Sequence, residues 1–466
     1  MCRIFILLIT IVSFSASIDY QFDGWIGSWN KRAFNINNPE YVDPIKGIYP
    51  TESYSTLALF LGVNTQLYKG NSSSVDFGFA GIFGGVVYDS TKSDRTIDGK
   101  LYVPDGLGYN YAGFWAGYLF DAPYGFLDAG RYVHNVVFPS TYIHYNSEYF
   151  EFWGGRYAVP TASYADLFSS YTQGVDLVFK YQDFRIFFEA SFGRANASWA
   201  GWIYDWYAPY SITTKKGVLT NLGMYFLGAD YRKNGLVIRP NFYFYPTLYY
   251  TPSLKVSYQS SPDFFEENRW GSKTQFLIFT PFQAENARFY PGGVGRYRYG
   301  DLPDKFAVSI DFNQTFNIDI YNVGFGFHKN FGSANGYLGN RGNTVFLVDI
   351  WDASVYDIGQ SISDAIGADA FTPYIYGGGR IKNFEWSVLG RLTYARRSNE
   401  QALRIGGSYN FKKEGILIGG FIEFFRDETK EGYKVGSSRP IPDNPENIAD
   451  RSYVAVYVKY NFLTNK

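Results

Sequence analysis

Cysteine is almost missing from this chain of 466 residues. The one cysteine, Cys2, lies ahead of a short apolar stretch at the very start of the sequence. Proteins that depend on thiols are therefore excluded, namely disulfide scaffolds, thiolate metal sites and enzymes with a cysteine nucleophile. Because Cys2 precedes the apolar stretch instead of following it, the sequence also argues against a lipoprotein anchor.

Long hydrophobic runs and an excess of one charge are missing as well. After residue 17, no segment reaches the roughly 18 uninterrupted apolar residues that a spanning helix needs. The formal net charge is −1, so the protein has no strong field to attract nucleic acid. We therefore expect neither membrane-spanning helices nor a nucleic-acid partner.

The first 17 residues have the pattern of a secretory signal peptide. Arg3 supplies a positive charge, Ile4–Phe14 is largely apolar, and the small residues Ser15–Ser17 follow where a signal peptidase reads. The apolar stretch is too short for a spanning helix. We predict export, with residues 1–17 removed and residues 18–466 forming one domain.

Aromatic residues and glycine are present in excess. Tyrosine and phenylalanine occur 43 times each, and aromatic residues make up 21% of the chain. Tyrosine and tryptophan favour positions with one apolar and one wet end, as at the edges of a bilayer. The composition is therefore compatible with a membrane protein that lacks spanning helices.

Alternation with a period of two is the dominant pattern, and it predicts strands. Tight polar turns join many strands into hairpins, for example at Gln182–Asp183 and Lys412–Gly415, whereas residues 89–108 and 426–452 are long polar connections. Short turns at one end and long loops at the other are typical of an outer-membrane barrel. We predict an all-β, transmembrane antiparallel β-barrel of about 18 strands, with 16 as the alternative.

The strand order depends on which segments form the first and last strands. The weakest predicted strands are Leu254–Gln259 and Thr344–Trp351. The last strand, Tyr453–Phe462, must pair with the first to remove both sheet edges, and we expect that first strand to be Leu57–Tyr68. Residues 18–54 would then form a periplasmic or plug-like segment.

The two rows of each strand predict which side chains face the lumen. In Phe184–Phe192 one row is apolar, whereas the other contains Arg185 and Glu189. A charge on the lipid face at mid-membrane depth costs roughly 2–4 kcal/mol, so such residues should point inward. The same test places these charged residues in the lumen: Asp176, Lys180, Arg185, Glu189, Arg239, Asp311, Arg391, Arg404 and Glu423. They form either the wall of a conduit or interstrand pairs that only solvate the interior.

Signals for catalysis or cofactor binding are weak. The three histidines, His134, His144 and His328, have no metal-ligand spacing, and no motif marks a serine near them. We expect no enzyme activity, no cofactor and no metal site.

Several segments resemble a known family. "GRYVHNVVFPSTYIHYNSEYFEFWGGRY", "SSYTQGVDLVFKYQDFRIFFEASFGRANASW" and "DWYAPY" are similar to the Hof-type outer-membrane proteins of Helicobacter and its relatives, and more distantly to OprD-like porins. The resemblance implies a monomeric barrel whose lumen is narrowed by an inward loop, here Val133–Tyr149. It also implies a basic row in the lumen, which here would be Arg131, Arg156, Arg239, Arg380, Arg391 and Arg404.

The sequence thus favours a porin in the outer membrane of a diderm (Gram-negative) bacterium. Its cargo would be small hydrophilic solutes, such as amino acids, peptides or other anion-bearing nutrients, and its further partners lipopolysaccharide and the barrel-assembly machinery. Phe462 would be the terminal aromatic that this machinery reads, and Leu463–Lys466 a disordered periplasmic stub. The alternatives are an adhesin or structural surface protein with a blocked barrel, and a secreted soluble β-propeller or sandwich.

Overall fold

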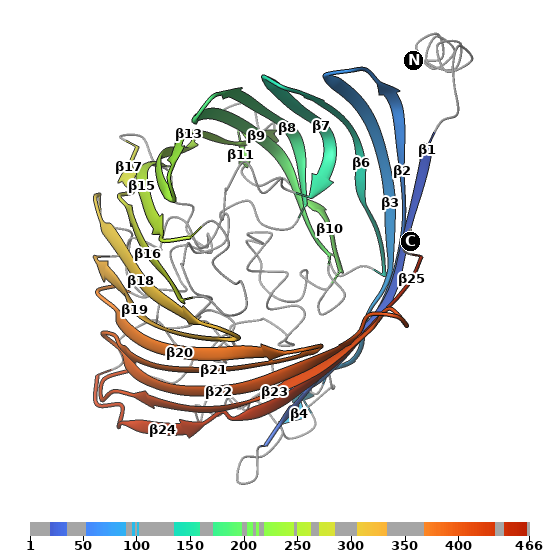
Figure 1. Ribbon diagram of the computed structural model, residues 1–466. Coiled ribbons are helices and arrows are strands. Elements are labelled where there is room, and N and C mark those ends of the chain that lie inside the picture. The colour runs from blue at the N-terminus through green and yellow to red at the C-terminus, as the bar shows by residue number, and fades with distance from the viewer. Residues whose placement is uncertain are drawn as a thin grey trace.

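The chain folds into one closed sheet of antiparallel strands in a computed structural model (Figure 1). The structure describes residues 19–34, 53–89, 96–97, 100–101, 135–158, 171–197, 203–207, 211–213, 219–246, 249–261, 270–284, 305–332, 368–433 and 442–463. No helix among these residues has the length and apolarity needed to cross a bilayer.

Eighteen long strands of the described chain form the barrel wall. They are β1 (Asp19–Ala33), β2 (Tyr54–Lys69), β3 (Ser73–Asp89), β6 (Val136–Ser147), β7 (Phe150–Ala158), β8 (Tyr171–Tyr181), β9 (Phe184–Ala197), β13 (Met224–Lys233), β14 (Leu236–Tyr245), β15 (Tyr249–Gln259), β16 (Trp270–Phe279), β18 (Val308–Ile318), β19 (Tyr321–Phe331), β20 (Phe371–Ile381), β21 (Phe384–Tyr394), β22 (Ser398–Phe411), β23 (Ile416–Thr429) and β25 (Tyr453–Leu463). Each pairs antiparallel with its neighbours in this order, and β1 pairs with β25.

Shorter strands extend the wall at its rim or form separate ribbons. β10 (Ile203–Tyr207), β17 (Phe282–Gln283) and β24 (Asn447–Asp450) pair with β9, β15 and β23, respectively. The two-stranded ribbons are β4 (Thr96–Ile97) with β5 (Lys100–Leu101), and β11 (Ser211–Thr213) with β12 (Leu219–Asn221).

The ends of the barrel differ in their connections. The tight turns after β2, β6, β8, β13, β18, β20 and β22 all lie at one end, where β1 also begins and β25 finishes. Most connections at the other end are long, although those between β14 and β15 and between β21 and β22 are short. In barrels of this kind the short turns are periplasmic, so the long connections face outward from the cell.

Along each wall strand, exposed apolar side chains alternate with buried polar ones. This alternation arises because one face of the wall meets lipid and the other faces the barrel interior. Along β9, Phe184 and Ile186 are 54% and 52% exposed, whereas Glu189 and Ser191 are fully buried. The exposed row meets lipid, where apolar groups are favoured, and the buried polar row faces the interior. Arg185 and Glu189 belong to this inner row.

Of four expectations about the chain, one needs correction, one is met by a strand, and two lie outside the described residues. The first strand is β1, not Leu57–Tyr68, so Asp19–Ala33 belongs to the wall and does not form part of a plug. Leu254–Gln259, a weak candidate, is the second half of β15. Thr344–Trp351 and the signal segment 1–17 lie outside the described residues.

The predicted inward loop at Val133–Tyr149 is wrong, because Val136–Ser147 forms the wall strand β6. Pro139 lies within this segment, and a proline within a run argues against a strand. In the structure it lies where the register between β3 and β6 shifts, between the pairs Ala80–Ser140 and Ile82–Val137. A proline is tolerated in a sheet at such a bulge, because its missing N–H is not needed there for the ladder.

The seam between β1 and β25 depends on the last aromatic residue. The ladder from Trp25–Asn461 to Ala33–Tyr453 is regular, and a register shift follows at Gly24, which pairs with Leu463. The Phe462 ring covers Gly24 so closely that a Cβ atom there would lie 2.7 Å from its Cε2 atom. Leu463 is therefore part of the seam, which corrects its assignment to a disordered stub.

We predict that Phe462→Ala lowers the free energy of unfolding by about 2 kcal/mol, less than the 3–5 kcal/mol typical of a core phenylalanine. The loss arises because the ring closes the seam over Gly24. Urea unfolding in micelles, followed by tryptophan fluorescence, measures it. Val458→Ala is the matched control, since Val458 is 39% exposed against 37% for Phe462 and lies on the same outer row. Equal losses in the two variants would contradict a special role for Phe462.

Candidate functional site

The inner wall of the barrel holds nearly all of the predicted site residues that the structure describes. The alternation in each strand brings these side chains inward: Asp176, Lys180, Arg185, Glu189, Arg239, Asp311, Arg380, Arg391, Arg404 and Glu423. Arg131 lies outside the described residues. The candidate site is therefore a polar surface that runs around the interior, and not a single pocket.

Arg156 does not continue this inner row. It lies on β7 in the row opposite to the buried Tyr157, at the last residue pair that joins β6 and β7. Its guanidinium carbon is 4.6 Å from the ring centroid of Trp206 on β10, and its Nε donates to Gln173 Oε1 at 3.0 Å. The Trp206 indole in turn donates to the Phe138 carbonyl at 3.1 Å. Arg156 thus braces the junction where the β6–β7 pairing ends.

A basic arc lies on the inner faces of β9 and β13–β16. Asp230 is fully buried and accepts hydrogen bonds from both Arg232 and Arg239. Arg185 pairs with Asp230 in register on the neighbouring strand. Two guanidinium groups thus contact one carboxylate, and a third arginine lies opposite it in the ladder, which leaves the cluster with a positive charge.

The basic arc continues with two lysines. Lys255 is directly opposite Arg239 in the β14–β15 ladder, and Lys273 is opposite Gln259 in the β15–β16 ladder. Neither ammonium group has a hydrogen bond or ion pair with a described residue. These two cations are therefore available to a solute inside the barrel.

Sequence reasoning missed Arg232, Lys255 and Lys273. Lys255 lies between Leu254 and Val256, so the alternation that identified Arg185 would have found it. It was overlooked because Leu254–Gln259 was a weak strand candidate. Arg232 was assigned to the turn, whereas the structure has it in β13.

A second group of charges, on β21–β25, is closely paired. Arg391 donates to Glu400 Oε2 at 2.7 Å and to Thr393 Oγ1 at 2.8 Å. Arg404 donates to Glu423 Oε2 at 2.8 Å, and the Tyr453 hydroxyl donates to the same oxygen at 3.3 Å. These are interstrand pairs, as the more cautious interpretation of the sequence had it. Arg380 also pairs with Glu385, near the tight-turn end, where both are exposed.

A third group, on β3 and β6–β9, is mainly acidic. His144 lies between two carboxylates, 3.5 Å from Asp76 and 3.4 Å from Glu151, and its ring stacks on Trp153. Lys180 forms an ion pair with Glu151 at 2.8 Å. Asp176 and Glu189 face each other across the β8–β9 ladder and are fully buried. The inner wall is thus segregated into a basic, a paired and an acidic region.

One constellation has the residue types of a hydrolase triad but not its geometry. Ser309 Oγ is 3.3 Å from His328 Nε2, and His328 Nδ1 is 3.6 Å from Asp311 Oδ2. The serine hydroxyl, however, donates to Asn330 Oδ1 at 2.7 Å, and Asp311 accepts from the Tyr374 hydroxyl at 3.2 Å. Ser309 lies within a regular strand, without the sharp turn and oxyanion donors that activate such a nucleophile. We therefore interpret the constellation as a buried polar network that joins β18, β19 and β20.

Comparison with known proteins shows one family and one fold. A family model described as "Putative outer membrane protein" matches residues 5–462. No curated protein is significantly similar to the chain in sequence.

Solved structures of similar fold include proteins of Pseudomonas aeruginosa and Acinetobacter baumannii. OpdK of Pseudomonas aeruginosa has a TM-score of 0.58 at 10% identity, with 95% of this chain and 99% of that chain covered; it has also been solved with vanillate. OccAB4 of Acinetobacter baumannii has a TM-score of 0.56 at 10% identity, with 96% and 98% covered. OprD of Pseudomonas aeruginosa has a TM-score of 0.55 at 9% identity, with 95% of each chain covered.

We predict that Asp230→Ala destabilises the barrel by about 3–5 kcal/mol, because it leaves the buried Arg239 guanidinium without its carboxylate. The free energy of unfolding in urea measures this loss. Glu385→Ala removes the carboxylate of the exposed pair with Arg380 and should cost about 0–1 kcal/mol. If the two variants were equally stable, Asp230 would not be the structural centre of the basic arc.

Proposed function

Because the chain belongs to the outer-membrane protein family whose model spans residues 5–462, we propose that it is a channel for small hydrophilic solutes. Its location is the outer membrane of a Gram-negative bacterium. The closed wall of 18 strands is wide enough that side chains alone do not fill its interior. The soluble propeller or sandwich is excluded by this closed barrel.

The observation that carries the proposal is the segregation of charge on the inner wall. Lys255 and Lys273 offer cations without partners among the described residues, next to the Arg239–Asp230 cluster. A wall of this kind attracts anionic groups and lets them leave, since the sites are several and individually weak. We therefore propose solutes that bear a carboxylate, including amino acids and short peptides, whose amino groups suit the acidic region at Asp76 and Glu151. The solved complex of OpdK with vanillate, an organic carboxylate, supports the same class.

We propose that the barrel works as a monomer and without catalysis. Its outer row is apolar around the wall, as a lipid-facing surface requires, and the described residues hold no group of three or more potential metal ligands. The adhesin alternative would depend on the long connections, most of which lie outside the described residues. No described feature favours it over a channel.

Lys255→Gln and Lys273→Gln should each shift the reversal potential toward cations in a salt gradient, and the double variant should shift it further. The reason is that the two ammonium groups lie in the lumen without a neutralising partner among the described residues. Planar-bilayer recording of single channels measures the shift. Removal of Arg239, Arg391 or Arg404 is a less direct test, since each removes the arginine partner of a buried carboxylate.

Lys329→Gln is the matched control for ion selectivity. Lys329 lies on the outer row of β19, where its ammonium group is 5.3 Å from the Phe331 ring centroid. Its loss should leave the reversal potential unchanged. An inserted protein without stepwise conductance would contradict the channel, whereas conductance with unaltered selectivity in the lysine double variant would contradict the basic arc alone.

A further inference from the structure

A groove lies on the outer face of β20–β23, close to the end with the long connections. Its apolar walls come from the lipid-facing row, with Ile375, Leu392, Leu403 and Phe424 between 40% and 61% exposed. The groove has a volume of about 790 Å³. The groove is a hollow in the lipid-facing surface, so its cause and its occupant need an explanation.

Gly390 forms the floor of the groove. It lies on the outer row of β21, between Leu403 of β22 and Ile375 of β20 in the two ladders. A Cβ atom at this position would meet nothing nearer than Ile375 Cγ2, at 3.8 Å. The hollow therefore exists because one outward side chain is missing, and not because the backbone needs glycine there. Its apolar lining suits a hydrocarbon chain.

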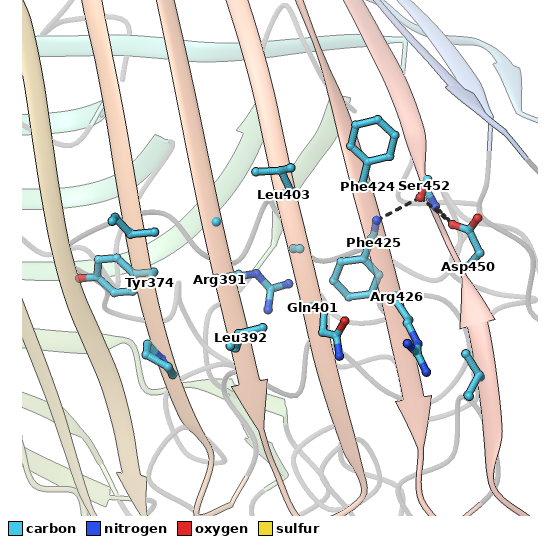
Figure 2. Close-up of a pocket in the computed structure, with 15 residues that line it drawn as sticks. Tyr374, Arg391, Leu392, Gln401, Leu403, Phe424, Phe425, Arg426, Asp450 and Ser452 are labelled. Atoms are coloured by element: carbon cyan, nitrogen blue, oxygen red, sulfur yellow. Dashed lines mark hydrogen bonds between the residues drawn. The ribbon is translucent and has the colours of Figure 1, made fainter.

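A polar edge closes the groove toward the long connections. Gln401 and Arg426 pair in register on β22 and β23, and Figure 2 shows their side chains next to each other. Both are exposed, and neither has a hydrogen bond or ion pair with a described residue. Asp450 pairs with Arg426 in register, yet its Oδ1 accepts hydrogen bonds from the N–H and hydroxyl of Ser452.

The depth of Arg426 fits the level of lipid headgroups. An outward arginine costs roughly 2–4 kcal/mol at the bilayer midplane, but only about 0–1 kcal/mol near the interface. Arg426 is three residues from the end of β23 at the rim. Its row therefore marks the boundary between acyl chains and headgroups in the outer leaflet.

Other outward charges near the groove are engaged or acidic. Arg396 pairs with Asp369, and Lys329 donates to the Asp369 carbonyl at 2.7 Å. The Gly332 N–H, together with Arg396, holds the pKa of the Asp369 carboxyl below its usual range. Glu428 follows Arg426 on the outer row. Arg426 is thus the cation at this site that is available to an anion.

We propose that this groove binds lipopolysaccharide, with an acyl chain over Gly390 and a lipid phosphate on Arg426 and Gln401. An arginine fork matches a phosphate in geometry and charge, and the Gln401 amide adds donors. The outer leaflet at the end with long connections presents such lipids, which carry both a phosphate and tightly packed acyl chains.

The test is native mass spectrometry of the purified full-length protein in detergent, titrated with hexa-acyl lipid A. Arg426→Gln combined with Gln401→Ala should reduce retained lipid A by about tenfold or more, the loss expected for a charge-assisted hydrogen bond. Gly390→Leu fills the groove and should reduce it similarly. Lys329→Gln and Gly377→Ala are controls expected to bind as the wild type does.

Two further ligands distinguish the source of the anion. Monophosphoryl lipid A should bind more weakly than the diphosphoryl form, and phosphatidylglycerol more weakly than both. Equal binding of phosphatidylglycerol, or unaltered lipid A binding in both groove variants, would overturn the proposal. The substituted side chains face lipid, so the single-channel conductance of these variants should equal that of the wild type. A wild-type protein that binds lipid A but does not conduct would contradict the channel and not the lipid site.

Discussion

The structure depends on one requirement, that no backbone hydrogen-bonding group is left unpaired where the wall meets lipid. An open sheet has two edges, and each would expose a row of such groups to hydrocarbon. Pairing of β1 with β25 removes both edges at once. The alternation of apolar and polar side chains, the even number of strands and the location of both ends of the sheet at the tight-turn side all follow from that closure.

The interior is organised by a second requirement, the neutralisation of buried charge. Asp230 with its arginines, Arg391 with Glu400, and Arg404 with Glu423 connect neighbouring strands across the ladder. Such pairs connect the strands of the wall and cancel most of the charge that they bury. Lys255 and Lys273, which have no such partner among the described residues, keep their positive charge. The same inward charges therefore serve both as interstrand ties and as the surface that a solute meets.

Much of this architecture could be predicted from the sequence, because the alternation of apolar and polar residues can be recognised within a single strand. In a membrane barrel this alternation separates the lipid-facing row from the lumen-facing row. Arg185 and Glu189 on one strand were sufficient to decide which row faces lipid. The identity of the first strand was not predictable in this way, because the outer row of Asp19–Ala33 has Gly24, Ser28 and Asn30 where a cleaner alternation would show apolar residues. Pro139 misled for a related reason: a proline within a run indicates a loop until the register shift that accommodates it is known. Ion pairing and the groove over Gly390 depend on which strands are neighbours, and a single strand contains no such information.

The closing ladder also determines how the protein can be made. β1 and β25 are the first and last strands of the described chain, so no shorter stretch can form the seam. Contacts between residues this distant in sequence form slowly, since the entropy of a very long loop must be lost before any of the pairing is gained. Each hairpin can form from local contacts, whereas the sheet closes only when β1 pairs with β25. Until β1 and β25 pair, the edges of both strands stay open to pairing with other chains.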